Sequence, residues 1–406
     1  MDRSFTIDED GLRYALDALR GEITFQDANL PDALPEVGIG QMATIERLAP
    51  HILGGASVHA HPSWFAHMDP PTPWITWATS LWNAAANQNL LHAETAPVAR
   101  EIEERVVAWL APAYGMDGGH MTPGSTVANL TALWAARERM GVTEVVTSEA
   151  AHISIAKSAA LLGLRLISVP TDRSGRIDPD AVPVDLSSAA LVLTAGTTAV
   201  GAIDPLDAVR HAAWLHVDAA WAGPLRLSPR HAPLLDGIDH ADSVAISGHK
   251  LLFQPKESGL VLFRETAASH AVVSSGAPYL ASPNVGLLGS HGASAVPLLA
   301  TLLSWGREGL AQRLDRCVEA AEVLGRFVDA HPLLELFAPP NCGVVAWRPR
   351  DAALLQPIVG ALGPGSVSTA LIDGELWLRN VAANPEVDPA LLINALATFL
   401  AGDRTG

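Results

Sequence analysis

One lysine stands out as a group that could bond covalently to a carbonyl compound. The chain has three lysines, Lys157, Lys250 and Lys256. Only Lys250 follows a histidine, in SGHK (247–250), directly after an apolar run at Val244–Ile246 that predicts a strand. Reactive groups of open α/β sheets lie at the carboxyl ends of strands. Lys250 is therefore the lysine we expect to form an imine.

An acidic residue follows a second predicted strand. The run Leu215–Val217 leads into Asp218, within HVDAAW (216–221). A carboxylate there could hold a ring nitrogen in its protonated form, because a nearby opposite charge favours the charged state. A lysine for an aldehyde and a carboxylate for a ring nitrogen suit pyridoxal 5′-phosphate (PLP), whose protonated ring is an electron sink. Ala220 is small enough to let a flat ring lie against the strand end.

A hydroxyl-rich helix start is a candidate phosphate site. The segment TPGST (122–126) runs straight into a predicted helix over Val127–Arg137. Free backbone N–H groups and hydroxyls at a helix start bind phosphate well. Ser125 and Thr126 could hold the phosphate or could simply cap the helix, and Ser247 and His249 could complete a phosphate site from the lysine segment.

A histidine precedes another predicted helix. His152 follows EAA (149–151) at the start of the helix expected over Ser154–Leu162. A histidine in this place could stack on the cofactor ring or be an ordinary surface residue. The spacing alone leaves both interpretations open.

Short apolar runs alternate with helical segments from residue 96 onward. Apolar residues at every fourth position from Val98 to Leu110 predict an amphipathic helix. Strands are predicted at Glu144–Thr147, Leu166–Val169, Ala190–Leu193, Leu215–Val217, Val244–Ile246 and Leu260–Phe263. Helices are predicted between them at Ser154–Leu162 and Ala208–Ala213. This alternation predicts an α/β fold with a mainly parallel sheet sandwiched by helices.

The chain is expected to have three parts. Residues 1–70 are predicted to form an N-terminal arm with helices over 11–20 and 41–54, and the Pro- and Trp-rich stretch His61–Trp82 is predicted to be extended. Residues 71–308 are expected to form the large PLP-binding domain, and residues 309–406 a small C-terminal α+β domain. The elements predicted in that last part are a helix over Leu310–Ala330, strands near Val344–Trp347, Ser366–Ala370 and Leu376–Leu378, and a helix over Pro389–Leu400.

Composition excludes several classes of protein. With 26 Lys+Arg against 43 Asp+Glu, the net charge of −17 argues against electrostatic binding to nucleic acid. Two cysteines, Cys317 and Cys342, cannot form a disulfide framework or a four-cysteine metal site, and no metal is expected. The first residues lack the basic start and apolar run of a signal peptide. The uncharged stretch Ala271–Gly306 is too rich in Gly, Ser and Pro for a membrane helix, so a cytoplasmic location is expected.

Five motifs in a fixed order carry a resemblance to a known family. They are TPGSTVANL (122–130), HIS (152–154), AGTT (195–198), HVDAAW (216–221) and SGHK (247–250). The chain resembles the PLP-dependent group II amino-acid decarboxylases, which include the glutamate, aromatic-L-amino-acid and diaminobutyrate decarboxylases. The likeness extends to HPSWF (61–65), NQNL (87–90), ETAPV (94–98) and LRN (378–380). It implies a fold-type I homodimer with active sites at the subunit interface, which converts an L-amino acid to its amine and CO2.

The resemblance also implies roles for individual residues. Lys250 would carry the internal aldimine, and Asp218 would pair with the pyridine nitrogen. His152 would stack on the ring and could orient the substrate carboxylate. Thr197 would lie near the ring substituents. Arg379 matches a family position that can bind a substrate carboxylate, although it could also be a surface arginine of the small domain.

The chain departs from the family at the proton donor. Many members supply the proton for Cα from a tyrosine on a mobile loop that reaches the neighbouring subunit. Here the segment after Tyr279 runs quickly into GLLGS (286–290), so the tyrosine-bearing loop is expected to be shortened or missing. His152 and His291 are alternative donors.

Three other functions stay open on this basis. A PLP-dependent carbon–carbon lyase or aldolase shares much of the same residue set. A cysteine desulfurase also carries SGHK, but it needs a nucleophilic cysteine, for which Cys342 is the candidate. A catalytically inactive PLP fold could act as a binding protein. The complete set of Lys250, Asp218 and His152 argues against that last function, and the shortened loop argues mildly for it.

Aromatic residues near the N-terminal arm are candidates for the substrate pocket. Trp64, Phe65 and His67, with Trp74 and Trp77, could shape a site for a flat or apolar side chain. They could instead pack a dimer interface. No second basic cluster suggests an acidic substrate, so the identity of the amino acid stays open.

Overall fold

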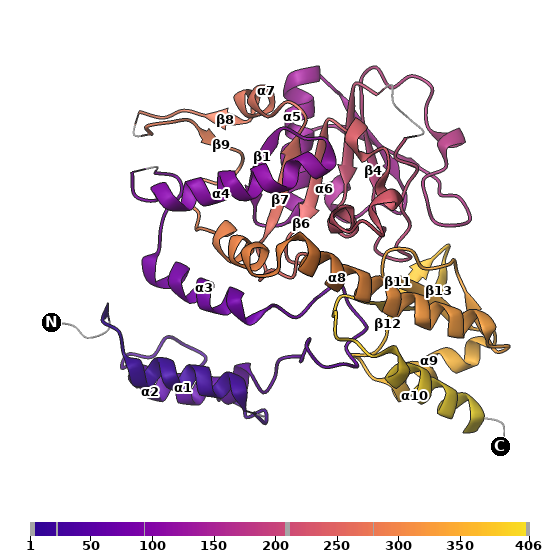
Figure 1. The fold of residues 1–406 in the computed structure, drawn as a ribbon, viewed down its shortest axis with the longest axis horizontal. Helices are drawn as coiled ribbons and strands as arrows, with labels where there is room; N and C mark the ends of the chain where they lie inside the picture. Colours follow the sequence, from indigo (N-terminus) through magenta and orange to yellow (C-terminus); the bar gives the residue numbers. More distant parts are fainter. Residues whose placement is uncertain (1–4, 22, 93, 208–211, 279, 403–406) are drawn as a thin grey trace. The chain divides into compact units, whose positions relative to one another are not determined.

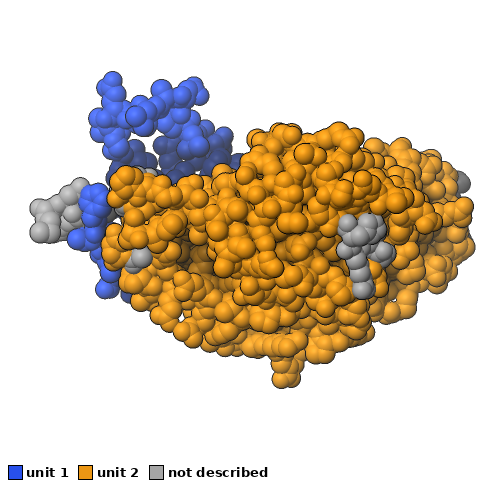
Figure 2. All heavy atoms as spheres, turned by 90° about the horizontal axis from the view of Figure 1, so that it is seen from above, with its two compact units in different colours: residues 1–58 blue, residues 59–406 orange. Residues whose placement is uncertain are grey.

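The computed structural model describes residues 5–21, 23–92, 94–207, 212–278 and 280–402 (Figure 1). Contacts between Cα atoms divide the chain into two units, residues 1–58 and residues 59–406 (Figure 2). The three-part division predicted from the sequence, with boundaries after residues 70 and 308, stays a prediction.

The first unit contains two helices. They are α1 (Glu9–Arg20) and α2 (Gln41–Ile52), and both confirm predicted helices. Asp8 caps α1, because its carboxylate accepts a hydrogen bond of 3.0 Å from the backbone N–H of Gly11. Arg47 of α2 donates to the carbonyl oxygen of Ala28 at 2.6 Å and so fixes the connecting segment.

The second unit is built around a seven-stranded sheet. Its strands are β1 (Gly118–Thr122), β2 (Glu144–Ser148), β3 (Arg165–Val169), β4 (Ala189–Thr194), β5 (Trp214–Asp218), β6 (Ser243–Ser247) and β7 (Gly259–Phe263). The spatial order is β1-β7-β6-β5-β4-β2-β3. β7 runs antiparallel to both of its neighbours, and the other neighbouring pairs are parallel. The predicted mainly parallel sheet is confirmed.

Helices cover both faces of this sheet, as Figure 1 shows. They include α4 (Pro97–Leu110), α5 (Ser125–Met140), α6 (Ile153–Leu162) and α7 (Thr266–Val272). Strand β4 is buried along its whole length. Leu191 and Leu193 pack into one core cluster, while Ala190 and Val192 pack into the other. This alternation is the pattern of a strand covered on both faces.

A second, four-stranded antiparallel sheet lies in the C-terminal part of the chain. Its strands are β10 (Leu334–Leu336), β11 (Val344–Pro349), β12 (Ser368–Ile372) and β13 (Glu375–Val381), in the order β10-β11-β13-β12. The accompanying helices are α8 (Ala295–Ala330), α9 (Leu355–Leu362) and α10 (Pro389–Gly402). Gly306 interrupts α8 with φ 61° and ψ −176°, two residues before the predicted boundary at 308.

The remaining elements are short. A two-stranded sheet pairs β8 (Ser274–Ser275) with β9 (Asn284–Val285). The 3-10 helices are η2 (Ala111–Tyr114), η3 (Pro179–Ala181), η4 (Gly223–Leu227), η5 (Ala232–Leu235), η6 (Ile238–His240) and η7 (Ala352–Leu354). No helix within the described ranges is both long enough and apolar enough to cross a membrane.

Two predicted elements differ from the structure. The stretch His61–Trp82 is not extended throughout, because helix α3 (Trp74–Ala86) begins directly after Pro73. Proline is tolerated at a helix start, so the proline-rich run marks where the helix begins rather than ruling one out. Of the helix predicted over Ala208–Ala213, residues 208–211 lie outside the described residues. The last two residues of that range are not helical.

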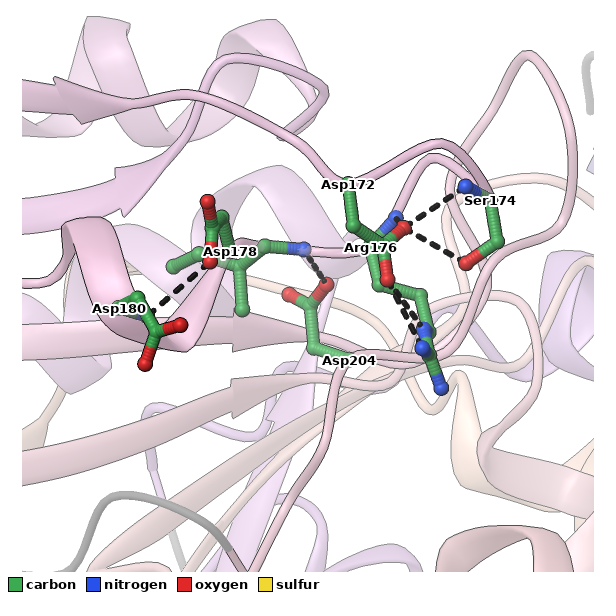
Figure 3. Close-up of polar contacts among 7 residues, drawn as sticks. Asp172, Ser174, Arg176, Asp178, Asp180 and Asp204 are labelled. Carbon is green, nitrogen blue, oxygen red and sulfur yellow. Dashed lines mark hydrogen bonds and ion pairs between the residues drawn. The ribbon is translucent and has the colours of Figure 1, made fainter.

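A turn between β3 and η3 is organised by Asp172 (Figure 3). One carboxylate oxygen accepts from the backbone N–H and the hydroxyl of Ser174 at 2.8 and 2.6 Å. The other accepts from Nε and Nη2 of Arg176 at 3.0 and 2.8 Å. Burial alone would raise the pKa of Asp172, but the bonds from Ser174 and Arg176 outweigh it and lower the pKa to about 2.

Asp204, beside this turn, is expected to contribute strongly to stability. Its two carboxylate oxygens accept from the backbone N–H groups of Ile177 and Thr194, both at 2.7 Å, in the interior. Asp204→Ala leaves both donors without a partner, at about 1–3 kcal/mol each. We expect urea unfolding to show a loss of about 2–4 kcal/mol. Asp180→Ala, at an exposed carboxylate in the same region, is the control and should change stability by less than about 0.5 kcal/mol; equal losses would contradict this role.

Candidate active site

Lys250 lies in the loop that follows β6, as predicted. Its side chain is half-buried, and this burial lowers its pKa, while nearby Asp218 acts to raise it. Among the described residues, the Nζ atom of Lys250 makes no hydrogen bond and no ion pair. A half-buried lysine with a lowered pKa and no partner is suited to attack a carbonyl group.

Asp218 ends strand β5, which is the parallel neighbour of β6. The side chain is 3% exposed. One carboxylate oxygen accepts from Nδ2 of Asn129 at 2.9 Å, and the other accepts from the backbone N–H of Ala220 at 3.1 Å. These bonds fix a buried negative charge, which is the environment that a protonated ring nitrogen requires.

Asn129 is a site residue that the sequence reasoning missed. It lies on α5 with its side chain fully buried. Besides its bond to Asp218, its Nδ2 atom donates to the hydroxyl of Ser154 at 2.9 Å, and its Oδ1 atom accepts from Nε2 of His216 at 2.9 Å. A polar amide in the middle of an alanine-rich helix was the available signal, within the quoted motif TPGSTVANL.

His152 caps helix α6, next to the network of Asn129. Its Nδ1 atom accepts from the backbone N–H of Ser154 at 3.2 Å and lies 2.8 Å from the hydroxyl of the same residue. Because Nδ1 is an acceptor, the proton of the neutral ring is on Nε2. Partial burial lowers the pKa of His152, whereas Asp218 acts to raise it. The ring is therefore neutral near pH 7, and Nε2 can donate.

The predicted phosphate residues come together at the start of α5. Gly124 precedes the helix with φ 118°, a conformation that favours glycine. A Cβ atom at Gly124 would lie only 2.9 Å from Cε1 of His249, so this imidazole lies directly against the helix start. Nε2 of His249 is 3.1 Å from the hydroxyl of Ser247. Ser125 is buried and Thr126 is exposed at the first turn.

His249 carries an unsatisfied polar atom at this place. Its Nδ1 atom is buried and has no hydrogen-bond partner among the described residues. Burial lowers the pKa of His249 to about 4, with Lys256 and Lys250 adding to the effect. An unpartnered ring nitrogen at a helix start fits a phosphate that is bound there. The residues present therefore fit PLP.

Thr197 and Ala220 lie at neighbouring strand ends. Thr197 is 1% exposed, and its hydroxyl accepts from the backbone N–H of Ala202 at 3.0 Å. Ala220 is 8% exposed and donates its backbone N–H to Asp218. The places predicted for both residues beside the cofactor ring stay predictions.

Arg379 is part of the site region rather than the surface of the small sheet. It lies on β13, where Nε donates to the hydroxyl of Ser368 at 3.1 Å and Nη1 donates to the carbonyl oxygen of Thr198 at 2.9 Å. Burial lowers its pKa, and Asp69 opposes this effect. Arg379 also lies within electrostatic reach of Lys250. Its binding of a substrate carboxylate stays a prediction.

The predicted substrate residues lie in different environments. Phe65 is 1% exposed and belongs to the main core, and its backbone oxygen accepts from the N–H of Val381 at 2.8 Å. Trp64 is 9% exposed and stacks on His59 with ring centroids 4.5 Å apart. His67 is half-buried, and burial together with Arg379 lowers its pKa. Of these three, His67 is the one with charged site residues around it.

The two other tryptophans of the predicted pocket lie on α3. Trp74 is 70% exposed and Trp77 is 47% exposed. Tyr279, which precedes the loop that we expect to be shortened, lies outside the described residues. His291 lines a cavity of about 180 Å³ together with Glu103 and His120. It also lines a second cavity with Thr122 and Lys256, and its role as a proton donor stays a prediction.

Comparison with known proteins identifies the family. The sequence model of the pyridoxal-dependent decarboxylase conserved domain matches residues 28–350. The chain belongs to this family. It is 33% identical over 403 residues to L-2,4-diaminobutyrate decarboxylase of Rhizobium meliloti (strain 1021), covering 88% of this chain and 81% of the relative. It is 28% identical over 390 residues to aspartate 1-decarboxylase of Aliivibrio fischeri, covering 80% and 70% respectively.

Solved structures share the fold. The crystal structure of Oryza sativa TDC with PLP and tryptamine gives a TM-score of 0.87 at 20% identity, over 98% of this chain and 99% of that chain. The crystal structure of mouse CSAD gives 0.84 at 24% identity, over 97% and 98%. The expected fold of a PLP enzyme is confirmed. The chain is a PLP-dependent amino-acid decarboxylase, a carboxy-lyase, and the alternatives of a carbon–carbon lyase and an inactive fold gain no support.

The structure also argues against the desulfurase alternative. Cys342 is 0% exposed, its thiol donates to the carbonyl oxygen of Gly201 at 2.9 Å, and burial raises its pKa to about 12. A nucleophilic cysteine needs an accessible thiolate. We expect Cys342→Ala to keep decarboxylase activity within about threefold while losing roughly 1 kcal/mol of stability to the small cavity. Loss of turnover by more than a hundredfold in a folded variant would give the thiol a chemical role.

Proposed function

We propose that this decarboxylase removes the α-carboxylate of an L-amino acid at a site formed by Lys250, Asp218 and His152. Bound PLP would supply the electron sink for the electrons of the bond that breaks. The observation that carries this proposal is the pairing of a half-buried lysine, which has no partner among the described residues, with a buried, hydrogen-bonded carboxylate at the ends of two adjacent parallel strands.

Each residue of the chain has a defined task in this proposal. Lys250 binds the cofactor through its aldehyde. Asp218, held by Asn129, keeps a proton on the ring nitrogen. His152 packs on the ring. The phosphate would be held by Ser125 and Thr126 at the start of α5 and by Ser247 and His249 beside Lys250. Thr197 and Ala220 would lie beside the ring.

Orientation of the substrate decides which bond breaks. Arg379 would bind the α-carboxylate and hold its bond to Cα perpendicular to the ring, an effect of positioning rather than of acid or base strength. A proton must then reach Cα. His152 is the donor that we propose in place of the loop tyrosine, acting as the imidazolium, which returns to the neutral ring when it loses the proton; Nδ1 of that imidazolium would face the hydroxyl of Ser154 at 2.8 Å.

The relatives suggest which substrate to test first. The Rhizobium meliloti relative is an L-2,4-diaminobutyrate decarboxylase, and we propose the same substrate for this chain. The test is incubation of the PLP-loaded protein with a pool of amino acids, followed by mass spectrometry. We expect CO2 and the amine that corresponds to one amino acid. Aldehyde or ketone products without an amine would contradict decarboxylation as the main reaction.

We also propose that the protein is a cytoplasmic homodimer with active sites at the interface. The apolar side chains that α3 exposes support a dimer: Trp74, Trp77, Leu81 and Trp82 are 70%, 47%, 50% and 64% exposed. Two free, buried cysteines are compatible with a reducing compartment. Sedimentation equilibrium should give twice the chain mass, and a monomer at micromolar concentration would contradict the dimer.

A further inference from the structure

A pair of oppositely charged side chains at the active site has no role in the function proposed above. Nζ of Lys256 forms an ion pair with Oδ1 of Asp69. The side chains are 61% and 39% exposed, respectively. An exposed ion pair contributes only about 0–1 kcal/mol. A bound ligand with a matching charge could therefore replace one of its partners.

The backbone holds both members of the pair in place. The indole N–H of Trp64 donates to the carbonyl oxygen of Asp69 at 2.9 Å. Lys256 lies in the loop between β6 and β7, where Phe253 and Glu257 adopt left-handed conformations with φ of 59° and 66°. Such conformations are uncommon outside glycine and tend to mark functional sites. The loop therefore fixes where the Lys256 side chain begins.

Both charges act on the cofactor end of the site. Asp69 raises the pKa of Lys250 and of His249, while Lys256 lowers the pKa of both. Asp69 also raises the pKa of Arg379. Lys256 lines a cavity together with Thr122 and Pro123, which directly precede the helix start that we expect to hold the phosphate. The pair therefore lies on the phosphate side of the site.

The acidic groups around Lys250 differ in the hydrogen bonds that they already accept. Both oxygens of Asp218 accept hydrogen bonds from the protein, from Asn129 and from the N–H of Ala220. The carboxylate of Asp69 is half-exposed, and within the described part of the chain its hydrogen-bond donor is Lys256. Asp69 is therefore the acid that can accept a new partner.

A bound cofactor phosphate would change the balance between the positive charge of Lys256 and the negative charge of Asp69. With Arg379 paired to the substrate carboxylate, a phosphate held by His249 would be a second anion near Lys256, so the Lys256 ammonium group would face two anions. An acidic substrate side chain would add a third negative charge, whereas a cationic one would balance the site. We propose that Asp69 binds a distal ammonium group of the substrate, so that the enzyme prefers α-amino acids that carry a second amino group.

This inference rests on the proposed function and names the residue that selects the substrate. The test compares L-2,4-diaminobutyrate with L-norvaline, which has a side chain of the same length but no charge, and with L-aspartate. We expect the wild-type enzyme to favour diaminobutyrate in kcat/KM. In Asp69→Asn the preference over norvaline should fall about ten- to a hundredfold, mostly through KM, because a charge-assisted hydrogen bond is lost.

Lys256→Gln is the matched control, since it breaks the same ion pair and keeps the carboxylate. We expect its preference for diaminobutyrate to be retained or increased. Equal losses of preference in both variants would show that the ion pair only links the segment of Asp69 to the loop of Lys256, and would overturn the proposal. A wild-type enzyme that favours norvaline or aspartate would overturn it as well.

A second readout separates this inference from the proposed function. Titration calorimetry of the PLP-loaded protein gives Kd for diaminobutyrate and for norvaline whether or not CO2 is released. Absence of CO2 with every amino acid would contradict the proposed function alone. A Kd ratio that Asp69→Asn leaves unchanged would contradict the role of Asp69, even in an active decarboxylase.

Discussion

Replacing Lys250 by alanine is expected to lower kcat by at least about 10⁴-fold. The variant loses the amine that would attach the cofactor and would bond to it again after each turnover, when the product is released. The ammonium group of the half-buried Lys250 has no partner among the described residues, so its removal breaks no hydrogen bond or ion pair there. We therefore expect the variant to fold with nearly the wild-type free energy of unfolding.

Mass spectrometry after borohydride reduction measures this attachment. The wild-type protein should retain PLP on the peptide that contains Lys250, and Lys250→Ala should retain none. Lys157→Ala and Lys256→Ala are the matched controls for attachment, since they change the chain's other two lysines. Covalently bound PLP in the Lys250 variant would show that another lysine carries the cofactor.

Asp218→Asn is expected to have the second largest effect. Asparagine keeps nearly the same shape and can still accept a hydrogen bond from Asn129, but it has no charge to keep the ring nitrogen protonated. Loss of one partner of a buried charge pair costs about 3 kcal/mol or more, which corresponds to at least about a hundredfold in rate. Weaker PLP binding should accompany this loss.

Turnover and cofactor affinity together check this second prediction. We expect kcat to fall at least about a hundredfold and the PLP dissociation constant to rise in Asp218→Asn. Asp236→Asn, at a 73% exposed carboxylate of the same unit, should leave both quantities unchanged. Wild-type turnover in Asp218→Asn would remove Asp218 from the proposed chemistry.

Local patterns in the sequence predicted most of the central sheet. Six of its seven strands are short apolar runs, and each was located to within a few residues. Strand β1 was missed because its residues, GGHMT (118–122), contain neither an apolar run nor an alternating pattern. Helix α3 was missed because prolines precede it and tryptophans obscure its periodicity.

The site could be predicted only where its residues lie in motifs. Lys250 and Asp218 follow predicted strands, so the topology of an α/β sheet places them at one edge. The bond between Asn129 and Asp218 joins residues 89 positions apart, and the ion pair between Asp69 and Lys256 joins residues 187 positions apart. No local pattern encodes contacts of that separation, so they emerge only from the folded chain.

The substrate roles of Trp64 and Phe65 stay predictions. The side chain of Phe65 lies in the core, and the indole N–H of Trp64 donates to the backbone carbonyl oxygen of Asp69. A large aromatic residue in the interior is explained by the apolar area that it buries. The residue whose place suggests a role in substrate selection is the neighbouring acid Asp69, which the sequence alone did not single out.

The most direct test of the proposed chemistry uses L-2,4-diaminobutyrate labelled with ¹³C in its carboxyl group. The PLP-loaded wild-type protein should release ¹³CO2 and 1,3-diaminopropane in equal amounts, and Lys250→Ala should release neither. Equal release by the Lys250 variant, or consumption of the substrate by the wild-type protein without ¹³CO2, would contradict decarboxylation at Lys250.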